Sequence, residues 1–221
     1  MNKQARLLSA LAALCVFFAF QQRVQAQTEE VPRFEVGVQF SSLTISEPSN
    51  HTEPGVGGRL TFNVNQYFAV EAQVDFYPSD DHRFGGLSGG RATTGFFGVK
   101  TGKRFEKFGV FAKARPGFVR FGRTFAGFSD IGPSPPDFPF FVPQFRSRTE
   151  FATDIGGVLE FYPTRRIVTR FDFGDTLIHY GERTTNARVF TPTGDVTLVP
   201  FTSPSVTRHN FQFSAGIGFR F

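Results

Sequence analysis

The sequence predicts an all-β fold in which eight antiparallel strands close into an up-and-down barrel that crosses a membrane. Eight segments alternate apolar and polar residues with the period of two that a strand shows when its faces meet different surroundings. Most segments are about 10 residues long, which suits a tilted strand crossing hydrocarbon. Short and long connections also alternate along the chain, as they do in a membrane barrel with short turns at one end.

The predicted strands are separated by connections rich in turn residues. The connections near Asn65, Arg104 and Thr164 are short, and the others are longer. The longest, 120–148, reads as a loop, and loops of that length usually mean function or disorder. Pro116 has no amide hydrogen, so we expect it at a bulge or beyond the membrane zone. The strands are expected at Arg33–Leu43, Gly55–Val64, Phe68–Tyr77, Thr93–Gly102, Phe108–Phe118, Glu150–Tyr162, Ile167–Ile178 and Asn210–Phe221.

Charge indicates which face of the strands looks inward. Charges of both signs gather on one face, and turning a Lys or Arg toward lipid at midplane would cost about 2–4 kcal/mol. An eight-stranded interior is only wide enough to be filled by side chains, so we expect an ion-pair network that plugs the lumen. Arg59 should lie diagonally between Glu71 and Asp75. The expected members are Glu35, Arg59, Glu71, Asp75, Lys100, Lys113, Arg115, Asp154, Glu160, Arg170, Asp172 and Arg220. A lipocalin-like barrel, with the faces reversed, is the alternative.

The last strand ends on an aromatic residue. From Asn210 to Phe221, apolar side chains alternate with small or polar ones. This strand resembles the closing strand of bacterial outer-membrane β-barrels, and the hairpin from Arg59 to Ala72 looks like the periplasmic hairpins of the OmpA-like and OmpX-like family. The resemblance implies a monomer in the outer membrane, with lipid and lipopolysaccharide around it, assembled by periplasmic chaperones and the barrel-assembly machinery. The implied assembly signal consists of Phe213, Ile217, Phe219 and Phe221.

The first 26 residues have the pattern of a secretory signal peptide. Lys3 and Arg6 precede an apolar core, and Val24-Gln25-Ala26 provides a small-residue cleavage site. A transmembrane anchor is the alternative, although the apolar run is short for a span. The one cysteine, Cys15, lies in this segment, so we expect no disulfide or cysteine ligand in the mature chain. The expected order is a signal peptide at 1–26, a periplasmic lead at 27–32 and the barrel at 33–221.

Net charge gives no indication of nucleic-acid binding. The chain carries +5, and removal of Lys3, Arg6 and Arg23 with the signal peptide leaves 5 − 3 = +2. Nucleic-acid-binding domains usually cluster Lys and Arg on one face, whereas the basic residues here are scattered. The sequence also gives no basis for inferring a peptidoglycan-binding domain.

Catalytic and metal-binding patterns are sparse. The four histidines, His51, His82, His179 and His209, have none of the spacings typical of metal ligands, and we expect no metal and no cofactor. Some eight-stranded barrels modify lipid A with His and Ser. Ser205 and His209 are close in sequence, but Asp195 or Glu182 would have to orient the histidine.

The long third connection is the best candidate for an interaction surface. Its candidate residues are Phe125, Phe128, Phe138, Phe140 and Phe141. A loop folded over the barrel mouth is the alternative. We therefore expect a non-enzymatic outer-membrane protein that serves envelope structure or surface interaction. Transport of a small hydrophobic molecule and modification of lipid A remain the alternatives.

Overall fold

The computed structural model describes residues 31–46, 51–79, 90–134, 138–190 and 196–221. The side chains of 130–140 lie outside this description. Residues Pro32–Phe221 form one compact unit. The predicted signal peptide, and most of the predicted periplasmic lead, lie outside the described residues. Within the described part of the chain, no helix has the length and apolarity needed to cross a membrane.

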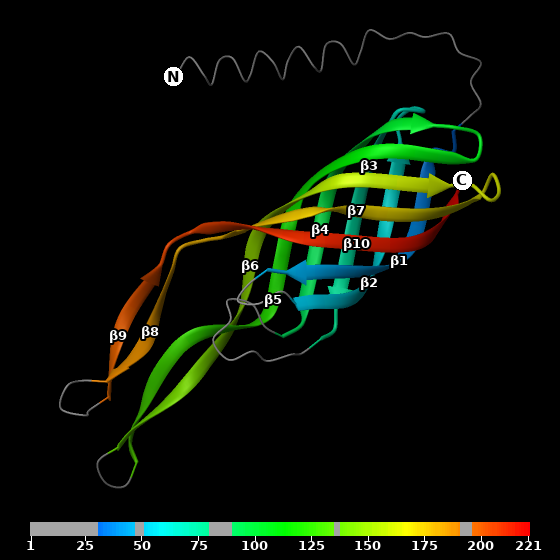
Figure 1. Ribbon diagram of the computed structural model, residues 1–221. Coiled ribbons are helices and arrows are strands. Elements are labelled where there is room, and N and C mark those ends of the chain that lie inside the picture. The colour runs from blue at the N-terminus through cyan, green and yellow to red at the C-terminus, as the bar shows by residue number, and fades with distance from the viewer. Residues whose placement is uncertain (1–30, 47–50, 80–89, 135–137, 191–195) are drawn as a thin grey trace, which may run out of the picture. The chain divides into compact units, whose positions relative to one another are not determined.

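Eight of the ten strands in the described part of the chain form a closed antiparallel barrel (Figure 1). The order round the ring is β1-β10-β7-β6-β5-β4-β3-β2, so the first and last strands pair and no barrel edge is left without partners. The predicted all-β, eight-stranded antiparallel barrel is confirmed. The barrel strands are β1 (Phe34–Ile45), β2 (His51–Asn63), β3 (Phe68–Tyr77), β4 (Ala92–Arg104), β5 (Phe108–Ser134), β6 (Phe138–Phe161), β7 (Ile167–Tyr180) and β10 (Val206–Arg220).

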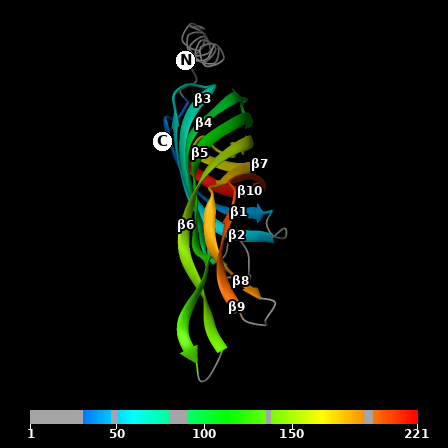
Figure 2. The same ribbon diagram turned by 90° about the vertical axis from the view of Figure 1, so that its left-hand side faces the viewer.

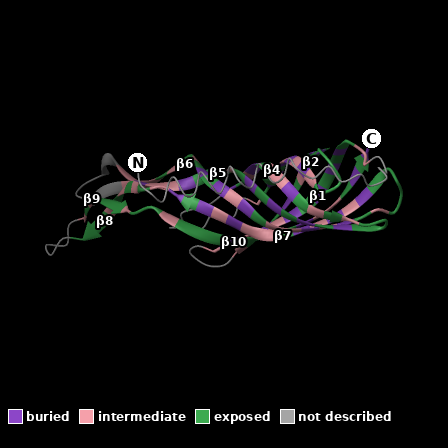
Figure 3. Cartoon of the chain, turned by 90° about the horizontal axis from the view of Figure 1, so that it is seen from above, coloured by how far each residue is buried: buried purple, intermediate pink, exposed green. Residues whose placement is uncertain are grey.

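Side chains along the barrel strands alternate between buried and exposed positions (Figure 3). On β1, Glu35 and Gln39 are buried, whereas Val38 and Phe40 are exposed. The exposed side of the barrel is therefore the apolar one, and the charged side faces the lumen. The lipocalin-like alternative, which requires the reverse orientation, is wrong.

The predicted loop at 120–148 is wrong, because most of it is strand. β5 and β6 continue past the barrel as a two-stranded extension that projects from one end (Figures 1 and 2). A two-stranded ribbon tolerates proline, since each strand has a side that needs no hydrogen-bond partner. Pro133 pairs with Pro139, and Phe128 with Pro143. The ladder shifts register between Phe121/Thr124, Phe125/Gly127 and Asp130/Pro133, which obscured the period of two.

The predicted last loop, 179–207, also contains strands. β8 (Arg183–Phe190) and β9 (Val196–Ser203) pair in a separate two-stranded sheet. β8 lies against the β5 extension, where the guanidinium of Arg188 covers the ring of Phe128 at 4.2 Å. Gly127 has a positive φ of 116°, and a Cβ there would come within 2.8 Å of the backbone nitrogen of Asn186. A side chain at position 127 would therefore strain this contact.

Of the two places predicted for Pro116, a bulge or a position beyond the membrane zone, the bulge is not observed. β5 pairs with β4 in one register on both sides of this residue, as Phe96 with Gly117 and Val99 with Ala114. Pro116 instead lies where the β4–β5 ladder is interrupted, while it still pairs with Thr153 of β6. The barrel accommodates the missing amide hydrogen through this local gap in the ladder.

Candidate functional site

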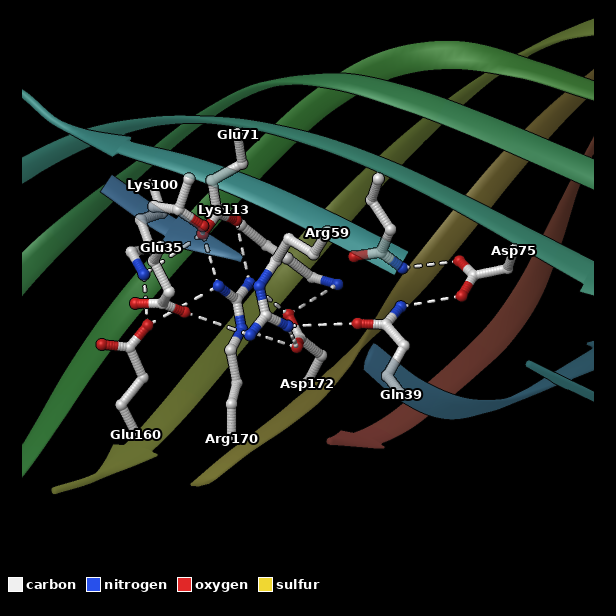
Figure 4. A network of polar contacts seen from close by, with 12 residues as sticks. Glu35, Gln39, Arg59, Glu71, Asp75, Lys100, Lys113, Glu160, Arg170 and Asp172 are labelled. Atoms are coloured by element: carbon white, nitrogen blue, oxygen red, sulfur yellow. Dashed lines mark hydrogen bonds and ion pairs between the residues drawn. The ribbon is translucent and has the colours of Figure 1, made fainter. Parts of the chain in front are cut away.

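The barrel interior is the candidate functional site, because ionisable side chains gather there. The twelve residues predicted for the lumen are buried, and none is more than 7% exposed. Ten of them are joined by ion pairs into a cluster, here called the charge layer (Figure 4). The charge layer consists of five cations and five carboxylates: Arg59, Lys100, Lys113, Arg115, Arg170, Glu35, Glu71, Asp154, Glu160 and Asp172.

Arg170 of β7 is the centre of the charge layer. Its Nη2 lies 2.8 Å from Oε2 of Glu71 and 2.7 Å from Oδ1 of Asp172. Its Nη1 lies 3.6 Å from Oε1 of Glu160. Glu71 belongs to β3, which is four places from β7 in the ring of eight strands. The Arg170–Glu71 pair therefore crosses the lumen from one wall to the opposite wall.

Arg115 and Lys113 connect β5 to the same layer. Nε of Arg115 donates to Oδ2 of Asp154 at 2.9 Å, and its Nη1 donates to Oε1 of Gln73 at 2.7 Å. Nζ of Lys113 lies 2.9 Å from Asp154 and 3.5 Å from Asp172. Buried charges are tolerated only when opposite charges and hydrogen bonds compensate for lost water. The equal numbers of cations and carboxylates balance the charge of the layer, although Oε2 of Glu35, Nε of Arg59 and Oδ1 of Asp154 are buried without a hydrogen-bond partner among the described residues.

Arg59 lies diagonally between Glu71 and Asp75, as predicted, because it pairs with Gln73. Its ion pairs are with other carboxylates. Its Nη2 lies 3.2 Å from Oε1 of Glu35, and its Nη1 lies 3.8 Å from Oδ2 of Asp172 and donates to Oε1 of Gln39 at 3.1 Å. Glu71 is paired instead with cations of other strands, including Arg170.

Asp75 is linked to the charge layer through two glutamines, and Arg220 lies nearer the short-turn end of the lumen. Asp75 accepts hydrogen bonds from the amides of Gln39 and Gln73 at 2.7 and 2.6 Å. The guanidinium of Arg220 covers the ring of Tyr162 at 4.2 Å, near the short-turn end of the barrel. These two residues therefore contribute hydrogen bonding and packing to the filling of the lumen.

An apolar cluster closes the lumen between the charge layer and the long connections. The sequence predicted an ion-pair network and left this cluster unrecognised. A signal for it exists, since the inward positions change from polar to apolar between Gln39 and Leu43 on β1 and between Asp75 and Tyr77 on β3. We call this cluster the apolar plug. It consists of Leu43, Ile45, Tyr77, Ala92, Phe96, Val119, Phe121, Ala152, Ile178 and Tyr180.

The phenylalanines proposed as an interaction surface pack within the hairpins. Phe125 and Phe128 are half-buried, and their ring centroids are 5.1 Å apart in an edge-to-face contact. Phe141 is also half-buried. The proposed side chains that lie outside the described residues are those of Phe138 and Phe140.

The exposed apolar residues of the projecting region lie on β8 and β9 instead. Val189, Val199 and Phe201 share one face of this hairpin, because Val199 pairs with Ala187 and Val189 with Thr197. All three are exposed, Phe201 at 59%. We call this face the apolar strip. The sequence did not predict this strip, because residues 179–207 were expected to form a loop.

The residues of the proposed assembly signal all point outward. Their recognition during assembly stays a prediction. On the neighbouring strand, Phe34 exchanges backbone hydrogen bonds of 3.0 Å with the terminal residue, which secures the end of the chain in the wall. The four outward residues are Phe213, Ile217, Phe219 and Phe221.

The ring of the histidine proposed for lipid A chemistry has a carboxylate beside it. The hydroxyl of Ser46 also contacts this residue, but it donates to the backbone carbonyl of His209 and not to the ring. Nδ1 of His209 lies 2.5 Å from Oδ2 of Asp175, which was not among the expected partners. Of the two expected carboxylates, Glu182 is exposed and Asp195 lies outside the described residues. Ser205 precedes His209 by four positions, about 13 Å at strand spacing. A nucleophile and its base need hydrogen-bond contact, so this serine and this histidine do not form a catalytic pair.

An apolar outer wall around a lumen filled with charges defines a barrel protein of the bacterial outer membrane. The chain belongs to the outer membrane protein beta-barrel domain family, whose model matches residues 11–221. No curated protein matches the chain.

Solved structures show the same fold at low sequence identity. Neisserial surface protein A has a TM-score of 0.54 and 11% identity, over 85% of this chain and 97% of that chain. OprG from Pseudomonas aeruginosa has a TM-score of 0.51 and 10% identity, over 86% of this chain and 96% of that chain. At these identities the likeness concerns the fold alone.

Proposed function

We propose that this is a non-enzymatic outer-membrane protein whose closed barrel holds the β8–β9 hairpin at the cell surface for contact with hydrophobic surfaces. The observation that carries the proposal is the apolar strip. Its three residues are exposed on a hairpin that projects beyond the barrel, rather than on the lipid-facing wall (Figure 1). Exposed apolar residues that adjoin one another are typical of interaction sites.

The filling of the lumen supports a closed barrel rather than a transporter. The charge layer spans the lumen, and the apolar plug covers it toward the long connections. Arg115 and Arg170 below, and Tyr77 and Ile178 above, are entirely buried. A solute would have to break buried ion pairs and displace aromatic rings to pass.

Conductance in planar bilayers tests the closed lumen. We expect the purified, refolded protein to add no stepwise current to the bilayer, since two filled layers block the path. Protein-free vesicles and heat-unfolded protein serve as controls. Discrete, reproducible conductance steps from the folded protein would contradict the proposal and favour transport.

The absence of enzymatic activity is the other part of the proposal. It is supported by the separation of Ser205 from His209, which leaves the histidine without the nucleophile considered for lipid A chemistry. The contact between His209 and Asp175 is exposed to solvent, at 78% and 41% side-chain exposure, and is explained as a surface hydrogen bond.

Adhesion to hexadecane tests the surface role. Cells displaying the protein should partition into hexadecane more than cells without it, because the apolar strip is presented to the medium. Replacing Val199→Ser and Phe201→Ser together should remove most of that increase. Thr202→Ser is the matched control, since a serine can keep the hydrogen bond to Thr184. Equal partitioning of both variants at equal surface amounts would argue against the proposal.

A further inference from the structure

Three exposed arginines lie together on the outer face of β4 and β5, near the end with the long connections. On β5, Val119 and Phe121 are buried, whereas Phe118 and Arg120 are exposed. Arg120 therefore points outward, one outward position beyond Phe118. This alternation separates Arg120 from the buried charges of the lumen.

Arg91 lies beside Arg120, directly before the first residue of the neighbouring strand β4. It directly precedes the buried Ala92 and is itself exposed, so it shares the outer face. Its carbonyl accepts a 2.7 Å hydrogen bond from the amide of Gly122, while Thr93 pairs with Arg120. Arg91 and Arg120 are thus diagonal neighbours, and the Cβ atoms of such neighbours lie roughly 7–8 Å apart or less.

A bulge adds Arg123 to this face. Phe121 and Thr124 are both buried, and the register shift between them leaves Gly122 and Arg123 exposed on the outer side. The guanidinium of Arg123 covers the ring of Phe145 at 4.5 Å, which restrains its position. We call Arg91, Arg120 and Arg123 the arginine triad.

The outward residues of β5 mark the membrane boundary below the arginine triad. The outward positions from Phe108 to Phe118 carry no charge, and Arg120 is the first outward position that does. Phe118 is exposed and pairs with the exposed Phe151 of β6, and girdles of aromatic residues flank the apolar band of membrane barrels. The apolar band of β5 therefore ends between Phe118 and Arg120, which places Arg120 at the level of the lipid headgroups.

The chemistry of the triad favours an anionic ligand. The outward neighbours of Arg120 across its two ladders are Thr93 and Thr149, neither of which carries charge. Arg91 and Arg120 carry like charges and are close on the sheet, so they repel each other, and an anion between these two removes that repulsion. Guanidinium groups bind phosphate oxygens with two parallel hydrogen bonds, which a single phosphate accepts from more than one arginine.

We propose that the arginine triad binds the phosphate groups of lipid A in the outer leaflet. Lipid A carries phosphate at the headgroup level and acyl chains that would lie along the phenylalanines below. The site therefore combines charge recognition with apolar contact. It shares no residue with the apolar strip of β8 and β9 and is independent of the proposed surface role.

Native mass spectrometry of the detergent-solubilised, folded protein tests this site. Diphosphoryl lipid A is the probe, and we expect the wild type to retain it through delipidation by detergent exchange. The variant Arg91→Gln, Arg120→Gln, Arg123→Gln should bind at least about tenfold more weakly, since each exposed contact contributes modestly. Arg165→Gln, Arg166→Gln, at the opposite end of the barrel, is the matched control. Heat-modifiable gel migration verifies that each variant is folded.

Two further probes separate the possible sources of the anion. Monophosphoryl lipid A should bind more weakly than the diphosphoryl form, and inorganic phosphate at millimolar concentration should leave diphosphoryl lipid A bound. Displacement by inorganic phosphate would overturn the assignment to lipid and indicate a site for free anions. Unchanged binding by the triple glutamine variant would overturn the site itself.

Discussion

The barrel and the projecting hairpins use the same β-pairing but differ in what determines their register. β1 and β2 pair through twelve consecutive residue pairs without a shift, from Phe34↔Phe62 to Ile45↔His51. The β5–β6 extension contains three register shifts. A slip by one residue in the barrel would turn lumen charges toward lipid. A slip in the extension would leave the side chains of both faces in similar surroundings. Register is strict only where the two faces meet different surroundings.

The largest expected effect comes from removing the centre of the charge layer. Arg170→Met should lower the free energy of unfolding by about 3–5 kcal/mol, because it leaves Glu71, Asp172 and Glu160 with less compensating charge in the lumen. Urea unfolding of the protein in detergent micelles measures this change.

Two further variants serve as controls for the charge layer. Arg165→Met, in an exposed turn, should change the free energy of unfolding by less than about 0.5 kcal/mol. Adding Glu71→Met to Arg170→Met should cost less than the sum of the single changes, because the two side chains interact across the lumen. Additive effects would mean that this pair contributes nothing specific to the barrel.

The next effect tests the lipid-facing wall. Val38 lies on the outer face of β1 and is exposed at 64%. Val38→Arg should lower the free energy of unfolding in bilayers by about 2–4 kcal/mol, since it places a charge against acyl chains. Val199→Arg, on the β8–β9 hairpin, is the comparison and should cost almost nothing. Similar losses at both sites would contradict the orientation of the wall.

The smallest effect is expected in the hairpin. Val199→Ser and Phe201→Ser together should change the free energy of unfolding by less than about 0.5 kcal/mol, because exposed side chains contribute little to stability. Urea unfolding of this variant, beside the hexadecane assay, separates surface contact from folding. A loss above about 2 kcal/mol would show that the hairpin supports the barrel.

The sequence predicted the barrel well because two opposed surroundings impose a period of two on every wall strand. It placed β3 at its observed bounds and assigned Glu71 and Arg170 to the interior. It could not predict the partners of Arg59, because side chains in the lumen meet across strands distant in sequence. Only the closed ring determines which of several carboxylates each cation reaches.

The sequence was less informative beyond the barrel. Prolines and phenylalanines between 120 and 148 indicated a loop. The two strands there pair with each other, and such a pair does not require polar and apolar residues to alternate. The apolar plug was missed for a related reason. Leu43 and Tyr77 occupy inward positions of β1 and β3, like the charged residues of those strands. The charged residues on that face led to the prediction of an ion-pair network alone.

The contact between Arg170 and Glu71 also constrains how the protein enters the membrane. Strands β7 and β3 face each other only after the seam between β1 and β10 has shut. Before that moment, Arg170 can pair with Glu160 and Asp172 on β6 and β7, and Glu71 can pair with Lys100 on the neighbouring β4. The pair that spans the lumen is therefore formed together with the complete cylinder, and it rewards closure alone.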